Sequence, residues 1–407
     1  MTRVDEQKSS TAQSVEQALE LVIPESVGLG TSAMSAQKPL RVLHVYRTYF
    51  PDTQGGLEEV IRQISMNTQR LGIESRVFAL SDNPGDRALD LREGTIFRSK
   101  KTFEIASCGV SFGALRTFRD QVDWADIVHY HFPWPFADVL HFGARVKKPT
   151  LLTYHSDIVR QKLLGRFYAP LMHRFLRSVD RIVCTSANYF ATSDVLTKYS
   201  DKVEVVPIGI NQSTYEQPLS TDIDAVEEVY GRDFFLFVGV LRYYKGLHIL
   251  LDSIRNAPYE VVIAGSGPTE NELLRQAKAS DVKNVHFAGH VSNAEKNALF
   301  ALCRGVVFPS YLRAEAFGVT LLEGAMFAKP LISTEVGSGT SHVNVHNETG
   351  YVVPPGSAKA LRKAMDKLWQ DAQLAERLGQ GARQRYERLF TGKLMGERYA
   401  DIYRHLG

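Results

Sequence analysis

Residues 41–80 read RVLHVYRTYFPDTQGGLEEVIRQISMNTQRLGIESRVFAL, and this stretch decides the class of fold. An apolar run at 41–46 comes first, and a turn that ends in two glycines follows it. Apolar side chains at helical spacing then fill 57–72, and a second apolar run begins at 74. A strand, a loop, a helix and a second strand in this order form the repeating unit of a parallel sheet.

The same rhythm continues along the chain and predicts two series of strands, separated by a polar, turn-rich segment at 211–233. Most of the runs are apolar throughout, as expected of parallel strands that helices cover on both faces. The further strands are predicted at 127–131, 149–155, 181–186, 203–209, 234–240, 260–265, 285–289, 305–310, 330–334 and 350–354.

We therefore predict an α/β protein with two doubly wound, Rossmann-like domains that face each other across a cleft. Residues 1–38 are rich in polar residues and bury too little to order, so they form a flexible extension. The first domain spans 39–212 and the second 213–385. Helical periodicity persists to the end of the chain, and 386–407 is predicted to pack back toward the first domain.

Composition excludes several classes of protein. Lys plus Arg is 48 and Asp plus Glu is 45, a balance that argues against a dedicated nucleic-acid binder. Cys108, Cys184 and Cys303 form no CxxC pair, so neither a disulfide framework nor a zinc site is predicted. The sequence holds no apolar run of membrane-spanning length and no secretory signal. These features predict a cytoplasmic protein without a metal.

Two glycine-rich turns link a predicted strand to a helix. Gly55 and Gly56 precede the helix at 57, where free N–H groups and the positive dipole end suit a phosphate. Gly265 lies in the second turn, AGSGPTE. Either turn could instead be a tight connection without a ligand. An acidic residue at a dinucleotide-fingerprint position is missing, which disfavours a dehydrogenase.

Arg242 and Lys245 follow the strand at 234–240, at the carboxyl end where ligands of such sheets bind. Two cations three residues apart could hold a diphosphate, because Arg binds bidentately and Lys acts as a point charge. A solvated basic turn is the plain alternative.

Glu315 and Glu323 frame the sequence EAFGVTLLE. Eight helical residues span at most about 12 Å, which is the scale of a nucleotide sugar. The N–H groups near Phe317, Gly318 and Val319 would face the space between the carboxylates. A dipole partner and a surface residue are the alternative, but Glu323 lies in an apolar helix, where a lone buried carboxylate is costly.

Histidines occur at the ends of two predicted strands of the first domain. His155 ends the strand at 149–155, while His129 and His131 alternate along 127–131 and so point to one face. A histidine beside a cleft can hydrogen-bond a ligand or move protons, although hydrogen-bonded core histidines are more common.

Taken together, these motifs resemble the retaining glycosyltransferases of family four, which have the GT-B fold. The resemblance runs from about residue 40 to the end. It rests on PDTQGG, the strand-end His155, GVLRYYKG, AGSGP and EAFGVTLLE, all in the same order. Asn211 departs from the Asp that often ends Pro-x-Gly-x-Asp in this family. The combination looks like bacterial mannosyl- and rhamnosyltransferases of lipopolysaccharide O-antigen assembly.

The resemblance implies a catalytic set. Arg242 and Lys245 would neutralise the leaving diphosphate of a nucleotide-sugar donor, which the resemblance suggests is GDP-mannose or GDP-rhamnose. Glu315 would bind sugar hydroxyls, and His155 would lie by the transferred sugar. His131 would lie on the acceptor side, in the first domain. The leaving phosphate would take the acceptor's proton, which retains the anomeric configuration, and no metal or other cofactor is implied.

The other residues that the resemblance implies all contact the donor. Glu323 would bind ribose hydroxyls and Val291 would lie by the base, while the rest offer backbone groups. The full set is Gly55, Gly56, Gly265, Val291, Phe317, Gly318, Val319 and Glu323.

The acceptor is predicted to be a saccharide, which could be lipid-linked, so contact with the inner face of the cell membrane is a further expectation. Residues 160–181 hold six Lys or Arg against one Asp, and Phe167, Leu171 and Phe175 share a helical face. An ordinary core-facing helix is the alternative. Two other functions stay open at this point, namely a sugar-nucleotide epimerase of the same fold and a non-catalytic sugar-binding module.

Overall fold

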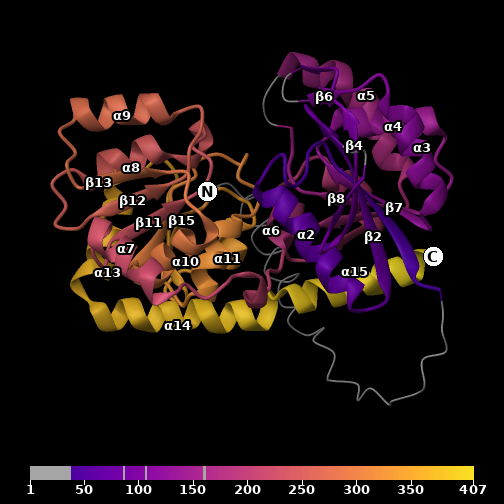
Figure 1. The fold of residues 1–407 in the computed structure, drawn as a ribbon. Coiled ribbons are helices and arrows are strands. Elements are labelled where there is room, and N and C mark those ends of the chain that lie inside the picture. The colour runs from indigo at the N-terminus through magenta and orange to yellow at the C-terminus, as the bar shows by residue number, and fades with distance from the viewer. Residues whose placement is uncertain (1–37, 86–87, 106–107, 159–161) are drawn as a thin grey trace, which may run out of the picture. The chain divides into compact units, whose positions relative to one another are not determined.

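The computed structural model describes residues 38–85, 88–105, 108–158 and 162–407. Apart from Lys38, the extension predicted at 1–38 lies outside the described residues. The chain divides into two compact units (Figure 1), which we describe separately. The first unit comprises the residues up to Val206 together with Met395–Gly407, and the second unit comprises Pro207–Leu394.

The first unit is built on an eight-stranded sheet with the order β10-β9-β8-β7-β1-β2-β4-β3. All neighbouring strands are parallel except β3 and β4. The strand order reverses between β1 and β7, the kind of point outside which ligands of open α/β sheets bind. The strands are β1 (Leu40–Val45), β2 (Ile73–Ser81), β3 (Ala88–Leu91), β4 (Gly94–Lys100), β7 (Ile127–Phe132), β8 (Thr150–Tyr154), β9 (Arg181–Cys184) and β10 (Val203–Val205).

Helices cover this sheet because their apolar positions recur at helical spacing. In α2, Val60, Ile61 and Ile64 are buried, and two acidic residues in its first turn suit the helix dipole. Helices α3, α4 and α5 pack in series, α4 between the other two (Figure 1). The helices are α2 (Gly56–Gln69), α3 (Ala114–Trp124), α4 (Pro135–Ala144), α5 (Lys162–Ser178), α6 (Ala187–Thr192) and the 3₁₀ helix η1 (Leu196–Lys202).

Four strands lie where the sequence predicts none. Strands β3 and β4 form the antiparallel edge of the large sheet, while β5 (Phe103–Ile105) and β6 (Cys108–Val110) form a separate hairpin. Every residue of β5 is exposed. A strand without a buried face carries no apolar run, and this explains why the sequence pattern missed it.

The C-terminal helix α15 (Gly392–Leu406) belongs to the first unit from Met395 onward. Its Gly396 lies against α2, where an added Cβ would lie 2.4 Å from the Cβ of Asn67. Tyr399 and Tyr403 of the same helix are buried and reach the strands of the first unit. Figure 1 draws this helix in yellow.

The second unit has a six-stranded, wholly parallel sheet with the order β13-β12-β11-β14-β15-β16. Its strand order reverses between β11 and β14, which makes the ends of these two strands the expected ligand site. The strands are β11 (Phe235–Val238), β12 (Val261–Ala264), β13 (Val285–Gly289), β14 (Gly305–Phe308), β15 (Leu331–Thr334) and β16 (Gly350–Val353).

Among the helices of the second unit, α7 packs with α10, α8 packs with α9 and α13, and α14 packs with α11 and α13. Among the residues that the structure describes, no helix is long and apolar enough to cross a bilayer. The helices are η2 (Gln212–Thr214), α7 (Ser220–Tyr230), η3 (Tyr243–Lys245), α8 (Leu247–Ile254), α9 (Glu270–Ala279), α10 (Asn293–Leu302), α11 (Val319–Met326), α12 (Thr340–Val343), α13 (Ala358–Gln370) and α14 (Ala372–Leu389).

Candidate active site

The loops after β11 and β14 bring two predicted site residues together at the switch point of the second unit. Lys245 Nζ lies 2.5 Å from Glu315 Oε2, although 70 residues separate them in sequence. The Ser310 hydroxyl donates to the same carboxylate oxygen at 3.2 Å. The side chains of Lys245 and Glu315 are only 12% and 9% exposed, so each charge is shielded by the other.

Arg242 lies differently from Lys245. It is exposed and precedes η3, and its side chain makes no ion pair with the residues that the structure describes. Its guanidinium is therefore available to an anion at the carboxyl end of β11. Arg313, from the loop after β14, instead donates to the carbonyl oxygen of Gly337 at 2.6 Å.

Glycines let these loops approach each other backbone to backbone. Gly246 has a φ of 71°, and an added Cβ would lie 2.1 Å from the carbonyl oxygen of Pro309. Gly265 has a φ of 128°, and its Cβ would lie 2.1 Å from the carbonyl oxygen of Gly239. Only glycine fits at either position. The loop packing by itself explains Gly265, and its contact with a donor stays a prediction.

The start of α11 lies at the predicted donor-binding residues Phe317, Gly318 and Val319. The helix begins at Val319, and Gly318 precedes it with a φ of 88°. Phe317 is only 3% exposed and lies edge-on to the ring of Phe390, so its side chain belongs to the core. The Thr320 hydroxyl donates to the carbonyl oxygen of Val238, which ties α11 to the end of β11.

Glu323 is not the lone buried carboxylate that the sequence suggested. Lys296 of α10 lies 2.7 Å from Glu323 Oε1, and its ammonium lies 5.0 Å from the centre of the Tyr215 ring. This pair explains the burial of Glu323 without a ligand. Lys296 was missed because no local pattern places it beside a residue 27 positions away. Val291 lies half-buried in the loop between β13 and α10.

The turn before α2 is stabilised by Glu58, an acidic residue that the sequence analysis did not single out. Glu58 accepts hydrogen bonds from the hydroxyls of Thr48 and Thr53 at 3.0 and 2.8 Å. Its Oε2 lies 2.6 Å from the place that a Cβ on Gly55 would take. A phosphate bound at Gly55 and Gly56 would therefore meet this carboxylate, and the predicted phosphate contact stays a prediction.

In the first unit, histidines line the switch point between β1 and β7. His131 Nδ1 lies 3.0 Å from Nε2 of His155, which follows β8, and His131 Nε2 lies 3.1 Å from Nδ1 of His44 in β1. As predicted, His129 and His131 share a face, with ring centres 4.3 Å apart. The sequence analysis missed His44, since a single histidine inside an apolar strand gives no signal.

Burial keeps these imidazoles neutral. His44, His129 and His131 are at most 1% exposed and His155 is 4% exposed. Desolvation lowers the pKa of His44 and of His155 to about 3, and it lowers the pKa of His129 and His131 well below the ordinary value. The group formed by these histidines is therefore polar but uncharged at neutral pH.

Comparison with known proteins decides the family. Residues 54–214 match the family described as Glycosyltransferase Family 4, and residues 221–385 match Glycosyl transferases group 1. D-rhamnosyltransferase WbpZ of Pseudomonas aeruginosa is 49% identical, over 86% of this chain and 92% of its own length. The O-antigen chain mannosyltransferase C of Escherichia coli is 48% identical, over 89% of this chain and 98% of its own. The chain belongs to glycosyltransferase family 4.

Solved structures resemble this family 4 glycosyltransferase over nearly the whole chain. Sucrose-phosphate synthase from Thermosynechococcus elongatus has a TM-score of 0.75 at 18% identity and covers 90% of this chain and 99% of its own. WaaG, a glycosyltransferase involved in lipopolysaccharide biosynthesis, has a TM-score of 0.64 at 17% identity, with 89% and 99% covered. These likenesses show the fold, which is GT-B.

The predicted fold class and the predicted reaction class, a retaining hexosyltransferase, are thus confirmed. WbpZ and mannosyltransferase C are both transferases, and neither supports the epimerase or the non-catalytic module. The roles of individual site residues are tested by none of these comparisons and stay predictions.

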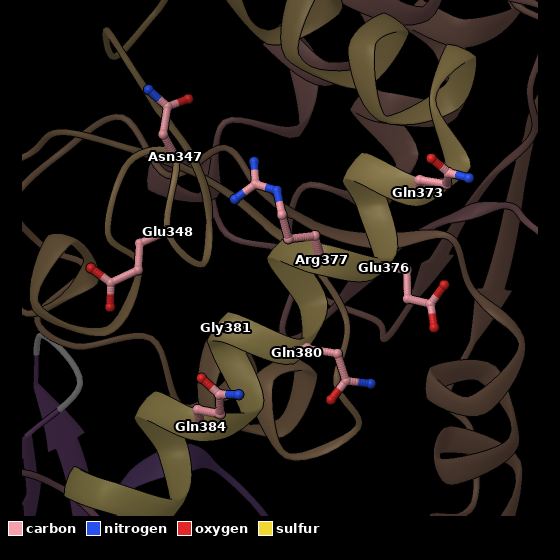
Figure 2. A pocket seen from close by; sticks show the side chains of 8 residues that line it. All are labelled: Asn347, Glu348, Gln373, Glu376, Arg377, Gln380, Gly381 and Gln384. Carbon is pink, nitrogen blue, oxygen red and sulfur yellow. The ribbon is translucent and has the colours of Figure 1, made fainter.

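A surface hollow of the second unit has none of the predicted site residues in its lining (Figure 2). It lies between α14 and the loop before β16, and its side chains diverge rather than converge on one point. Substrate sites have polar groups that converge on the ligand, and this hollow lacks that feature. Its lining residues are Asn347, Glu348, Gln373, Glu376, Arg377, Gln380, Gly381 and Gln384.

Proposed function

We propose that this glycosyltransferase moves D-rhamnose or mannose from a GDP-sugar to a lipid-linked saccharide in O-antigen assembly. The observation that carries the proposal is identity near one half, over almost full lengths, with a D-rhamnosyltransferase and an O-antigen chain mannosyltransferase. D-rhamnose is 6-deoxy-D-mannose, so one binding site needs to differ only around carbon 6 to favour either sugar.

The geometry at the carboxyl ends of β11 and β14 supports a role in holding the donor. Arg242 is exposed, whereas Lys245 is held by Glu315. A diphosphate bound by Arg242 would attract Lys245 away from its carboxylate partner. Glu315 would then be free to accept hydrogen bonds from sugar hydroxyls. Donor binding would therefore replace the ion pair between Lys245 and Glu315 by a contact of Lys245 with the diphosphate and a contact of Glu315 with the sugar.

The same cations would lower the barrier of the transfer. Negative charge develops on the diphosphate as the glycosidic bond breaks, and preorganised cations stabilise that charge. The leaving phosphate oxygen would accept the proton of the attacking hydroxyl on the same face of the sugar. This course retains the anomeric configuration, and it uses only residues of the chain and oxygens of the donor.

A transfer assay with GDP-D-rhamnose, GDP-mannose and UDP-glucose tests the proposal. We expect turnover with one of the GDP-sugars, and we expect Arg242→Ala and Lys245→Ala each to lower kcat about a hundredfold or more. Glu315→Ala should abolish most of the transfer. Lys283→Ala is the control, because this lysine is 83% exposed and lies outside the site. Turnover with UDP-glucose alone, or wild-type kcat in both cation variants, would refute the proposal.

Binding can be measured without an acceptor. A ligand that binds only the folded protein at a hundred times its Kd stabilises it by about 2.7 kcal/mol. We expect GDP to raise Tm in wild type, and we expect Arg242→Ala to weaken that response. A rise in Tm with UDP but not with GDP would contradict the proposed base.

We further propose that the first unit contacts the inner face of the cell membrane, where a lipid-linked acceptor would reside. The hairpin of β5 and β6 exposes Phe103 and Ile105, and nearby Phe112 is 80% exposed with its ring 5.6 Å from that of Phe103. On α5, Phe167 is 83% exposed, but Phe175 is buried in the core. The apolar face predicted for this helix is therefore divided between the surface and the core.

Co-sedimentation with vesicles that contain anionic phosphatidylglycerol tests this contact. Wild type should bind at low salt, and a Phe112→Ser, Phe167→Ser double variant should bind several-fold more weakly. Leu274→Ser is the control, because this residue is 43% exposed on α9 of the second unit. Equal binding by the double variant and wild type, or no binding by wild type, would contradict the proposed surface.

A further inference from the structure

A chain of three buried imidazoles leads from the core of the first unit to the candidate site. It begins at His44 in β1, passes through His131 in β7 and ends at His155 after β8. In both links a ring Nδ1 faces a ring Nε2, at 3.1 Å and 3.0 Å. The far nitrogen of His155, its Nδ1, makes no hydrogen bond with the described residues.

The protons on the three imidazoles can be arranged in two ways. Each neutral imidazole carries one N–H, and each link needs one donor and one acceptor. If His44 carries its proton on Nδ1, then His131 and His155 must do so as well. If His44 carries it on Nε2, all three carry it there. His155 accordingly presents either an N–H or a lone pair at Nδ1.

One observation separates the two arrangements. His44 Nε2 is buried and has no partner among the described residues. In the first arrangement this atom is an unused acceptor, and in the second it is an N–H donor without an acceptor. Buried N–H groups without a partner are rarer in proteins than buried acceptors without one, so the first arrangement is favoured.

We infer that His44 and His131 are positioning residues that hold His155 as the Nδ1–H tautomer, so that His155 donates a hydrogen bond to an oxygen of the sugar donor. The ligand contact rests on the proposed function, whereas the tautomer does not. His155 in this role acts as a neutral donor and removes no proton from the acceptor.

The neighbouring histidine belongs to a different network. His129 Nδ1 lies 2.7 Å from the hydroxyl of Tyr403, and its Nε2 lies 2.7 Å from that of Thr153. Thr153 in turn meets Tyr399 of α15 at 2.9 Å. His44, His129 and His131 are close enough to surround a metal ion, but both nitrogens of His129 and of His131 are already engaged in hydrogen bonds. The described contacts therefore favour a hydrogen-bonded chain over a metal site.

Nitrogen-15 NMR of the full-length, histidine-labelled protein tests the tautomer directly. Long-range ¹H–¹⁵N correlations distinguish a protonated Nδ1 from a protonated Nε2, and His155→Gln assigns the signal. At pH 7 without ligand, we expect His155 to be protonated on Nδ1. Protonation on Nε2, or stoichiometric zinc in the purified protein by elemental analysis, would overturn the inference.

Two substitutions of His44 separate positioning from folding. The amide of His44→Asn can replace the Nδ1–H donor, so it should keep the His155 tautomer and nearly wild-type kinetics. His44→Leu removes the donor, so it should release His155 into a mixture of tautomers and lower kcat/KM about tenfold. Tyr403→Phe, which alters only the His129 network, is the control. A fixed Nδ1–H tautomer in His44→Leu would overturn the positioning role.

The two proposals fail in different experiments. His155→Ala should lower kcat/KM at least as much as His44→Leu does. Wild-type kinetics in His155→Ala would refute the ligand contact, even if the NMR signal showed the expected tautomer. If the variants of His155 and Arg242 both kept full activity, the proposed site itself would be wrong.

Discussion

The buried histidines should make the stability of the first unit depend on pH. A substitution of His44 alone should reveal the part of this dependence that His44 contributes. The pKa of His44 is about 3 in the folded protein and about 6.5 when unfolded. Below pH 6.5 the unfolded chain therefore binds a proton that the folded chain does not, and the folded state loses stability as pH falls. The loss is about 1.4 kcal/mol for each pH unit between 6.5 and 3, or about 2 kcal/mol from pH 7 to pH 5.

The perturbation is His44→Asn, which removes the titrating group and retains a hydrogen-bonding one. Other groups also titrate between pH 7 and 5, but they are common to both proteins and cancel in the difference. We expect wild type to lose about 2 kcal/mol more than the variant over this interval. A matched control is His405→Asn, because His405 is exposed on α15 and lies outside the series from His44 to His155.

Urea unfolding at pH 7, 6 and 5 measures this difference. A Trp369→Phe background removes the only tryptophan of the second unit, so the fluorescence reports on Trp124 and on the buried Trp134 of the first unit. Parallel losses of stability in wild type and His44→Asn would refute the reasoning. They would mean that His44 is protonated as easily in the folded protein as in the unfolded chain, so the three imidazoles would not form a neutral chain.

Two further predictions concern the second unit. Lys296→Met leaves Glu323 without its partner and should cost about 1–2 kcal/mol in urea unfolding, less than for a fully buried pair because Lys296 is partly exposed. Glu323→Gln added to it should restore most of that loss, and a lack of recovery would show that the pair is not the cause. Gly265→Ala should lower the free energy of unfolding by about 2 kcal/mol or more, because its Cβ would meet the Gly239 carbonyl at a φ that alanine rarely adopts. Gly113→Ala, with open space around it and an ordinary φ, is the comparison and should change stability by about 0.5 kcal/mol at most.

Much of the fold could be predicted because buried parallel strands are apolar along their whole length. The run at 41–46 corresponds to β1 (Leu40–Val45), and the run at 305–310 corresponds to β14 (Gly305–Phe308). The edge of the first sheet could not be found in this way. Strand β3 alternates between exposed and half-buried positions, and β5 is wholly exposed, so neither has the pattern of a core strand.

The sequence predicted which strand ends carry the candidate site residues, but it did not predict which side chains contact each other there. Residues that follow β11 and β14 meet because these strands are neighbours, and no local sequence pattern reveals the order of the strands in a sheet. The pairing of Lys245 with Glu315 depends on it, as does the position of His44 beside His131. The residue types and the strand ends can be predicted from local sequence patterns. Which charged side chains neutralise each other can be predicted only when the order of the strands in the sheet is known.

The two units meet the cost of burying polar groups in different ways, and the difference matches the roles proposed for them. In the second unit the buried charges neutralise each other, as Lys245 does with Glu315. Such a pair is stable without ligand, and in the proposed function an incoming diphosphate would replace the carboxylate as the partner of Lys245, because both are anions. In the first unit His44, His131 and His155 are neutral imidazoles, whose hydrogen bonds impose a direction without a net charge. A neutral donor at His155 would orient a sugar oxygen without competing with Arg242 and Lys245 for the negative charge of the leaving group.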